Sequence, residues 1–126
     1  MTEKQNSKIY DLEDRTFGFA KSVRRFVRAL KQDIPNYEDS KQLVRSSGSV
    51  GANYIEANDS LSKKDFIMRI KIFRKEAKES RYWLNLIESF EDKKLAEERH
   101  ALAREAQELM NIFGAILQKS KQGGVL

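Results

Sequence analysis

Cysteine is absent from this chain of 126 residues, and histidine occurs once, as His100. Without a thiol the protein can form neither a disulfide framework nor a thiolate metal site, and it suits a reducing compartment. A lone histidine also excludes a metal site that needs two histidine ligands. We therefore expect no bound metal and no cofactor.

Residues that break helices are scarce as well, because the chain has one proline and six glycines. This scarcity favours long helices. No apolar run approaches the roughly 18 residues of a membrane span, and residues 1–10 lack the apolar segment of a signal peptide. The chain is long enough to bury a core without cross-links. We expect one soluble, cytoplasmic helical domain.

Positive charge is unevenly distributed along the chain, whose net charge is +5. Residues 16–31 contain five bases and no acid, and residues 63–81 contain eight bases and three acids, so each segment carries +5. Such concentration favours a polyanion or an acidic protein as partner. The alternative is that the lysines and arginines only solvate outward helix faces.

The first helix is predicted over about residues 12–33. Its apolar residues recur every three or four positions, which places them on one face. They are Phe19, Val23, Phe26 and Leu30, with Phe17, Ala20 and Val27 widening the face. Pro35 is expected to end this helix, since the residue before a proline is pushed away from helical backbone angles. The candidate contacts to nucleic acid here are Lys21, Arg24, Arg25, Arg28 and Lys31.

The second helix is predicted over about residues 39–58 and is rich in small side chains around Gly48 and Gly51. A glycine inside a helix costs about 1 kcal/mol relative to alanine, so we expect a neighbouring helix to approach closely there. A phosphate-binding loop is the alternative, but the lysine of that motif is missing and no strand precedes the segment. The two glycines also match the clamp of KH RNA-binding domains, whose flanking strands are not visible.

The third helix is predicted over about residues 63–89, where Ser62 followed by Asp65 resembles a capping box. Its apolar residues keep the spacing of a bundle seam over three heptads. Met68 and Trp83 fall on a second face, which indicates a second neighbour within the chain or in another subunit. A third face carries further candidate contacts to nucleic acid, namely Lys71, Arg74, Lys78 and Arg81.

A fourth helix is predicted over about residues 94–120. Four helices with short connections predict an all-α, antiparallel up-down-up-down bundle. The bundle is expected to span residues 11–120, between flexible ends at residues 1–10 and 121–126. No Ser–His–Asp arrangement is supported, and one histidine cannot supply the paired Glu-x-x-His motifs of di-metal bundles. We therefore expect a protein that is not an enzyme and has no catalytic residues.

One face of the second helix carries polar residues at spacings of three and four. They are Gln42, Arg45, Ser49, Asn53 and Glu56. As a hypothesis, this polar stripe meets Lys75, Glu76 and Glu79 of the third helix in a hydrogen-bonded network, because buried charges need partners. The alternative is a polar pocket that binds a ligand.

Three motifs resemble those of a known family. They are SSGSVGANYIEAN at residues 46–58, SKKDF at 62–66 and KEAKES at 75–80. Over about residues 11–90 the chain resembles the bacterial four-helix-bundle proteins encoded within intervening sequences of 23S ribosomal RNA genes. The motif residues Arg45, Ser49, Asn53 and Glu56 are all present, whereas Glu-Ala-Asn stands where many members have Glu-Gly.

The resemblance implies a small helical protein that forms a homo-oligomer, typically a barrel-like pentamer. A related bundle, the accessory protein of diversity-generating retroelements, is a basic pentamer that works with reverse transcriptase and nucleic acid. No catalytic residue is established for the family. Its connection with RNA rests on the location of the gene.

These observations predict a non-enzymatic, ring-like homo-oligomer that binds nucleic acid, RNA in the first place, through its basic helix faces. Contacts are expected mainly with phosphates, because no aromatic platform for bases is evident. The alternative is an interaction scaffold whose basic faces dock an acidic protein. No membrane partner is expected.

Overall fold

The computed structural model describes the backbone of residues 2–122 and the side chains of residues 12–121. Its helices are α1 (Thr2–Ala29), α2 (Ile34–Asn58), α3 (Lys63–Leu86) and α4 (Lys93–Gln122). Residues 2–122 contain no strand. The predicted all-α class with four helices is therefore confirmed.

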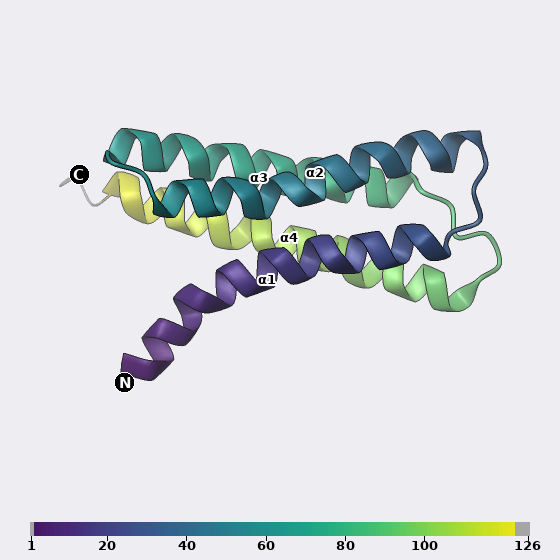
Figure 1. The fold of residues 1–126 in the computed structure, drawn as a ribbon, viewed down its shortest axis with the longest axis horizontal. Coiled ribbons are helices and arrows are strands. Elements are labelled where there is room, and N and C mark those ends of the chain that lie inside the picture. Colours follow the sequence, from purple (N-terminus) through teal and green to yellow (C-terminus); the bar gives the residue numbers. More distant parts are fainter. Residues whose placement is uncertain (1, 123–126) are drawn as a thin grey trace.

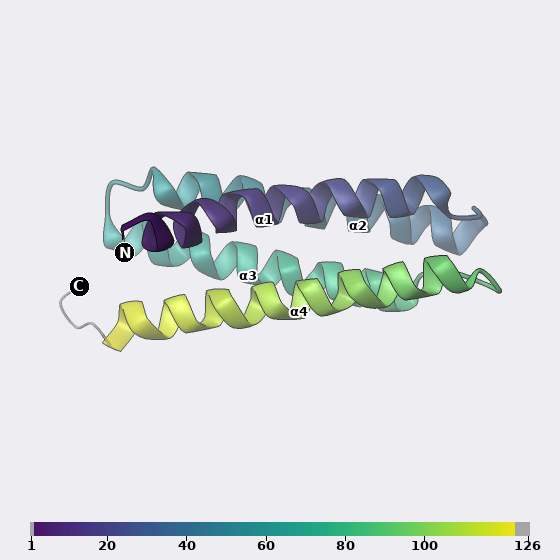
Figure 2. The same cartoon turned by 90° about the horizontal axis from the view of Figure 1, so that it is seen from below.

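The helices lie along one long axis, and consecutive helices run in opposite directions in Figures 1 and 2. Helices α1 and α3 each pack against both α2 and α4, so α1 and α3 lie diagonally across the bundle. The N-terminal end of α1 diverges from the other helices (Figure 1). The α2–α3 turn and the C-terminal end of α4 lie at one end of the bundle, and the other two connections lie at the opposite end.

Aromatic side chains form the centre of the core. The ring of Phe73 in α3 stacks on Tyr54 of α2 at a centroid distance of 5.6 Å and on Phe113 of α4 at 3.9 Å. The predicted apolar face of the first helix is buried at Phe19, Val23, Phe26 and Leu30. The spacing of apolar residues thus identified the core-facing side of the helices.

The prediction for Phe17 is wrong, because its side chain is 65% exposed. Phe17 precedes the buried Phe19 by two positions, and residues two apart on a helix do not share a face. The aromatic ring instead lies at the surface, where Lys21 places its ammonium 5.6 Å from the ring centroid.

Pro35 begins a helix rather than ending one. The first helix ends at Ala29, not near residue 33, and α2 starts at Ile34, not near residue 39. A proline is tolerated in the first turn of a helix, where its missing N–H group would have no partner in the helix. Asp33 caps this turn, since its carboxylate accepts a hydrogen bond of 2.9 Å from the backbone N–H of Asn36.

Other helix ends also differ from the predicted ones. Helix α1 already begins at Thr2, about ten residues before the predicted start, because residues 2–11 contain no glycine or proline to interrupt it. Helix α3 ends at Leu86 rather than near residue 89, ahead of Phe90, whose φ of 54° is not helical. Helix α4 continues to Gln122, and residues 123–126 of the predicted tail lie outside the described part of the chain.

Asn36 joins two connections at one end of the bundle. Its side-chain amide donates hydrogen bonds to the backbone carbonyls of Lys31 (3.1 Å) and Glu88 (2.9 Å). Its carbonyl oxygen accepts a bond of 3.0 Å from the backbone N–H of Glu88. Asn36 is 2% exposed, so these bonds satisfy backbone groups in the interior. The α1–α2 and α3–α4 connections are thereby fastened together.

The small residues of α2 let α1 approach closely, as predicted. A Cβ atom at Gly51 would lie 3.1 Å from the hydroxyl of Thr16, and one at Gly48 would lie 3.1 Å from the Arg24 guanidinium. Thr16 is buried and its hydroxyl donates to the carbonyl of Leu12 at 2.8 Å. Close helix packing therefore explains Gly51, whereas the space beside Gly48 is taken by a flexible arginine side chain.

Candidate nucleic-acid interface

A basic groove runs between α3 and α4 at the end where α3 begins and α4 ends. It consists of two adjoining hollows of about 490 and 410 Å³ that share Lys71 and Lys121. Its cationic lining residues are Lys63, Lys64, Lys71, Arg74, Lys75, Lys78 and Lys121. The apolar lining residues are Ile67, Met68, Met110 and Leu117. The one remaining lining residue is Ser120. No acidic residue lines either hollow.

The cations of the groove have no carboxylate partner among the described residues. The ion pairs among the described residues lie outside the groove and involve Arg15, Lys41 and Arg45. Partial desolvation lowers the pKa of the Lys63 ammonium below its ordinary value. Seven neighbouring positive charges without a compensating acid produce a positive potential that attracts anions.

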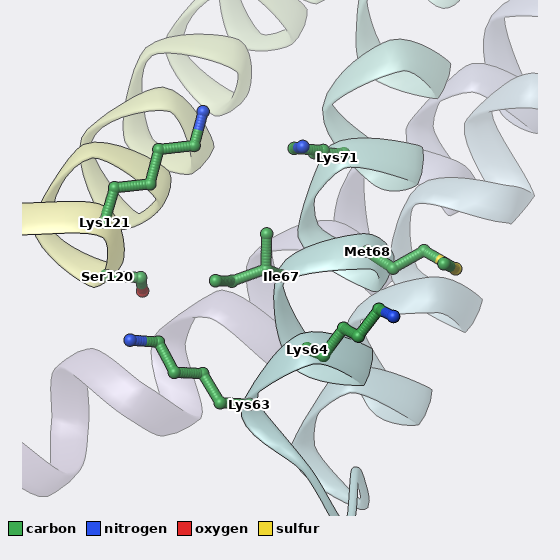
Figure 3. Close-up of a pocket in the computed structure, with 7 residues that line it drawn as sticks. All are labelled: Lys63, Lys64, Ile67, Met68, Lys71, Ser120 and Lys121. Carbon is green, nitrogen blue, oxygen red and sulfur yellow. The ribbon is translucent and has the colours of Figure 1, made fainter. Parts of the chain in front are cut away.

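Figure 3 shows how the first hollow is built. Lys63, Ile67 and Lys71 extend from α3 toward α4, and Lys121 extends from α4 back toward α3. Lys64 and Met68 turn toward the outer side of α3. The groove therefore has an apolar floor with ammonium groups on both of its walls.

The predicted basic stripe of α3 is divided between the groove and a contact with α4. Lys71, Arg74 and Lys78 line the groove, and Arg74 lies over Gly114, where an added Cβ atom would be 3.6 Å from its Nε. Arg81 instead donates a hydrogen bond to the side-chain carbonyl of Gln107. Three of the four predicted residues therefore belong to one surface.

The predicted basic residues of α1 do not join this groove. Lys21 lies over Phe17, and Lys31 lies over the ring of Phe90 at 5.5 Å. Arg24 reaches α2, where it donates to the carbonyl of Val44 at 3.4 Å.

The remaining bases of α1 also stay on their own side of the bundle. Arg25 donates to the hydroxyl of Ser22 at 3.1 Å, and Arg28 is exposed. Helices α1 and α3 are diagonal neighbours. The two basic segments therefore do not form one surface within a single chain.

The predicted polar network forms only in part. Arg45 of α2 contacts two carboxylates of α3, Glu79 at 2.9 Å and Glu76 at 3.5 Å. Asn53 donates to the carbonyl of Ser49 at 2.8 Å and accepts a bond of 3.3 Å from Arg69. Arg69 was not among the predicted residues, although its position one turn before Phe73 is on the side of α3 that meets α2.

Three members of the predicted network lie elsewhere. Gln42 and Glu56 are exposed, and neither side chain makes a hydrogen bond with another described residue. Lys75 lines the basic groove instead of facing α2. Within one chain, the arrangement connects α2 to α3.

Sequence reasoning missed an ion pair that joins α1 to α4. The guanidinium of Arg15 contacts the carboxylate of Glu105 at 2.6 and 2.9 Å and that of Glu108 at 2.8 Å. The hydrogen bond to Glu105 raises the pKa of Arg15 above its ordinary value, against the opposing effect of burial. The partners are about 90 residues apart in the sequence, so local spacing gives no signal of this contact.

Two further properties concern the described residues only. No helix in residues 2–122 combines the length and apolarity needed to cross a membrane. Among residues 12–121, whose side chains the structure describes, no group of three or more acidic, histidine or cysteine side chains could hold a metal ion.

Comparison with known proteins places the chain in a family. The model of the family described as 23S rRNA-intervening sequence protein matches residues 8–115. The chain belongs to this family. A crystal structure of a protein of unknown function from the S23 ribosomal protein family of Bacteroides thetaiotaomicron is 29% identical, with a TM-score of 0.74. The match covers 88% of this chain and 98% of that one. No curated protein matches the chain.

Membership in this family confirms the resemblance noted from the sequence motifs. It also agrees with the four helices of the structure, because the related crystal structure shares the fold over most of both chains. Seven cationic residues line the basic groove.

Proposed function

We propose that the protein is a non-enzymatic, oligomeric nucleic-acid-binding protein of the cytoplasm, with RNA as its first expected ligand. The observation that carries this proposal is the basic groove between α3 and α4, which is lined by seven cations and no acid. Phosphate groups release counterions when lysine and arginine neutralise them, and this release drives binding. The family's description, which names an intervening sequence of 23S rRNA, supports RNA as the ligand.

The proposed assembly is a ring of antiparallel four-helix bundles, with a pentamer expected from the resemblance. Exposed apolar residues on two unlike sites support it. Phe17 and Ile55 flank a small hollow between α1 and α2, and Met68 lies on the outer side of α3. Contact between unlike sites of successive copies generates a ring when the rotation between the copies closes. A ring would repeat the groove and strengthen binding through multivalency.

The salt dependence of RNA binding tests the proposed function. Fluorescence anisotropy with a labelled 30-nucleotide RNA is measured between 20 and 200 mM salt for the wild type and the triple variant K71Q/R74Q/K78Q. Each phosphate contact contributes about 0.7 to the slope of log K against log salt for a single strand. We expect the variant's slope to be smaller by about 2, whereas an absence of RNA binding by the wild type at 20 mM salt would overturn the proposal.

A second candidate function is a scaffold that docks an acidic protein. The observation in its favour is the apolar floor of the groove, because amphipathic helices bind in grooves through apolar side chains. Ile67, Met110 and Leu117 provide this floor beneath the cations. Capture experiments with and without nuclease distinguish the two functions, since a protein partner that survives nuclease treatment supports the scaffold.

A further inference from the structure

On the basis of the proposed function, we infer that the basic groove takes single-stranded nucleic acid and holds it by its phosphates, without reading the bases. Three properties of the groove lead to this inference, namely its shape, its floor and the chemistry of its cations.

The shape of the groove suits an extended strand. The groove follows the neighbouring helices α3 and α4, which form its walls, and its cations recur along α3 from Lys63 to Lys78. A positively charged groove of this kind can follow the backbone of a single strand. The distance along α3 from Lys63 to Lys78 is roughly 22 Å at 1.5 Å per residue, which accommodates a few nucleotides.

The floor of the groove favours an unpaired strand as well. Ile67, Met110 and Leu117 present aliphatic surface between the ammonium groups. A duplex buries its base faces by stacking and offers mainly phosphates to its surroundings, so the apolar floor would remain uncovered. An unpaired strand exposes ribose and base faces that can cover it.

The lining residues have little capacity to distinguish bases. Base edges are read by amide, carboxylate or arginine groups in fixed positions, and single strands are also read by stacking on aromatic rings. Six of the seven cations are lysines, which act as point charges on flexible stems. The exposed aromatic residues Phe17, Tyr37, Tyr82 and Phe90 line neither hollow. Affinity should therefore depend weakly on sequence.

Binding of matched single-stranded and duplex probes tests the inference. Labelled 12-mers of oligo(U), oligo(A) and mixed sequence are compared at 50 mM salt with a blunt RNA duplex that has the same number of phosphates. We expect each single strand to bind at least tenfold more tightly than the duplex, and the three strands to agree within about threefold. The variant K71Q/K78Q should lose at least tenfold in affinity for single strands. The control K93Q/K94Q, which removes two exposed charges from the opposite end of the bundle, should change it less than twofold.

Each contrary outcome has a separate meaning. Duplex affinity equal to or greater than that of the single strands overturns the inference and leaves the proposed function in place. A spread of more than tenfold among the strands overturns the claim that bases are not read. Equal losses of single-strand affinity in K71Q/K78Q and K93Q/K94Q show that the groove is not the binding site. Binding of polyglutamate without binding of any nucleic acid overturns both the inference and the proposed function.

Discussion

At the scale of single residues, Asn36 joins two connections of the bundle through its side chain. Its three hydrogen bonds hold the backbone of Lys31 and Glu88 in a place where water has little access. Buried backbone groups that lose a partner are costly. The stability of one end of the bundle therefore depends on a single amide.

We predict that Asn36→Ala lowers the free energy of unfolding by about 2–4 kcal/mol, because the change leaves several buried backbone groups without partners. Urea denaturation of the purified protein measures the effect. Asn85→Ala, at an exposed position of α3, is the control and should change stability by less than about 0.5 kcal/mol. Similar losses in the two variants would contradict the role assigned to Asn36.

Tyr54 provides a prediction about alkaline pH. Burial of its phenol, assisted by the nearby Glu13 and opposed by a hydrogen bond with Asn58, raises its pKa above the ordinary value. The unfolded chain ionises this group near pH 10, whereas the folded chain retains the proton to higher pH. This contribution to stability is therefore complete below about pH 10 and is lost as the pH rises through the folded pKa.

We expect the wild type to lose more stability between pH 8 and pH 11 than the variant Tyr54→Phe, which has no phenol to ionise. Thermal unfolding at the two pH values measures the difference. Tyr82→Phe removes a phenol that is 58% exposed and should behave like the wild type. If the loss of stability is the same for all three proteins, Tyr54 is not responsible for it.

At the scale of helices, the close packing of α1 on α2 depends on Gly51. We predict that Gly51→Ala destabilises the protein relative to Gly18→Ala by roughly 1–3 kcal/mol, the usual effect of overpacking. The new methyl group would meet the buried Thr16 at 3.1 Å, whereas nothing lies within 4 Å of the corresponding position at Gly18. Gly18→Ala alone should stabilise α1, because alanine favours helices by about 1 kcal/mol. Chemical denaturation of both variants measures the difference, and equal stability would contradict close packing at Gly51.

The sequence predicted the helices and their core faces well, because apolar spacing is a local property. It failed at Pro35, since the same rule that ends a helix before proline also permits proline in the first turn of the next one. It failed at Phe17, where apolar character was counted without regard to the angular position on the helix. In both cases the residue type was correctly recognised, but its position on the helix was predicted wrongly.

The candidate site was less predictable than the fold. Lys71, Arg74 and Lys78 could be recognised from their spacing on one helix face. Lys121 could not, because it joins the groove only through the packing of α4 against α3. Contacts between residues distant in the chain, such as that of Arg15 with Glu105, leave no trace in local spacing.

At the scale of the whole molecule, assembly should depend on the exposed apolar site between α1 and α2. We predict that F17S/I55S lowers the oligomeric state, measured by light scattering coupled to size exclusion, because these side chains are 65% and 51% exposed in a single chain. Leu61→Ser is the control, since Leu61 is fully exposed in the α2–α3 turn and should leave assembly unchanged. If F17S/I55S has the same oligomeric state as the wild type, this apolar site is not part of the interface between subunits.

The contacts of Asn36 have a mechanical consequence for the opposite end of the molecule. Two of the three connections are fastened together at one end. The basic groove begins at the other end, where only the α2–α3 turn joins neighbouring helices, and runs past the middle of α3. Helix α3 has 24 residues and is therefore about 36 Å long. If α3 and α4 tilt apart as rigid rods, the fastened end acts as the pivot and the displacement grows with distance from it. A tilt of a few degrees then changes the width of the groove by about 2 Å at its Lys63 end and leaves the Asn36 contacts almost unmoved.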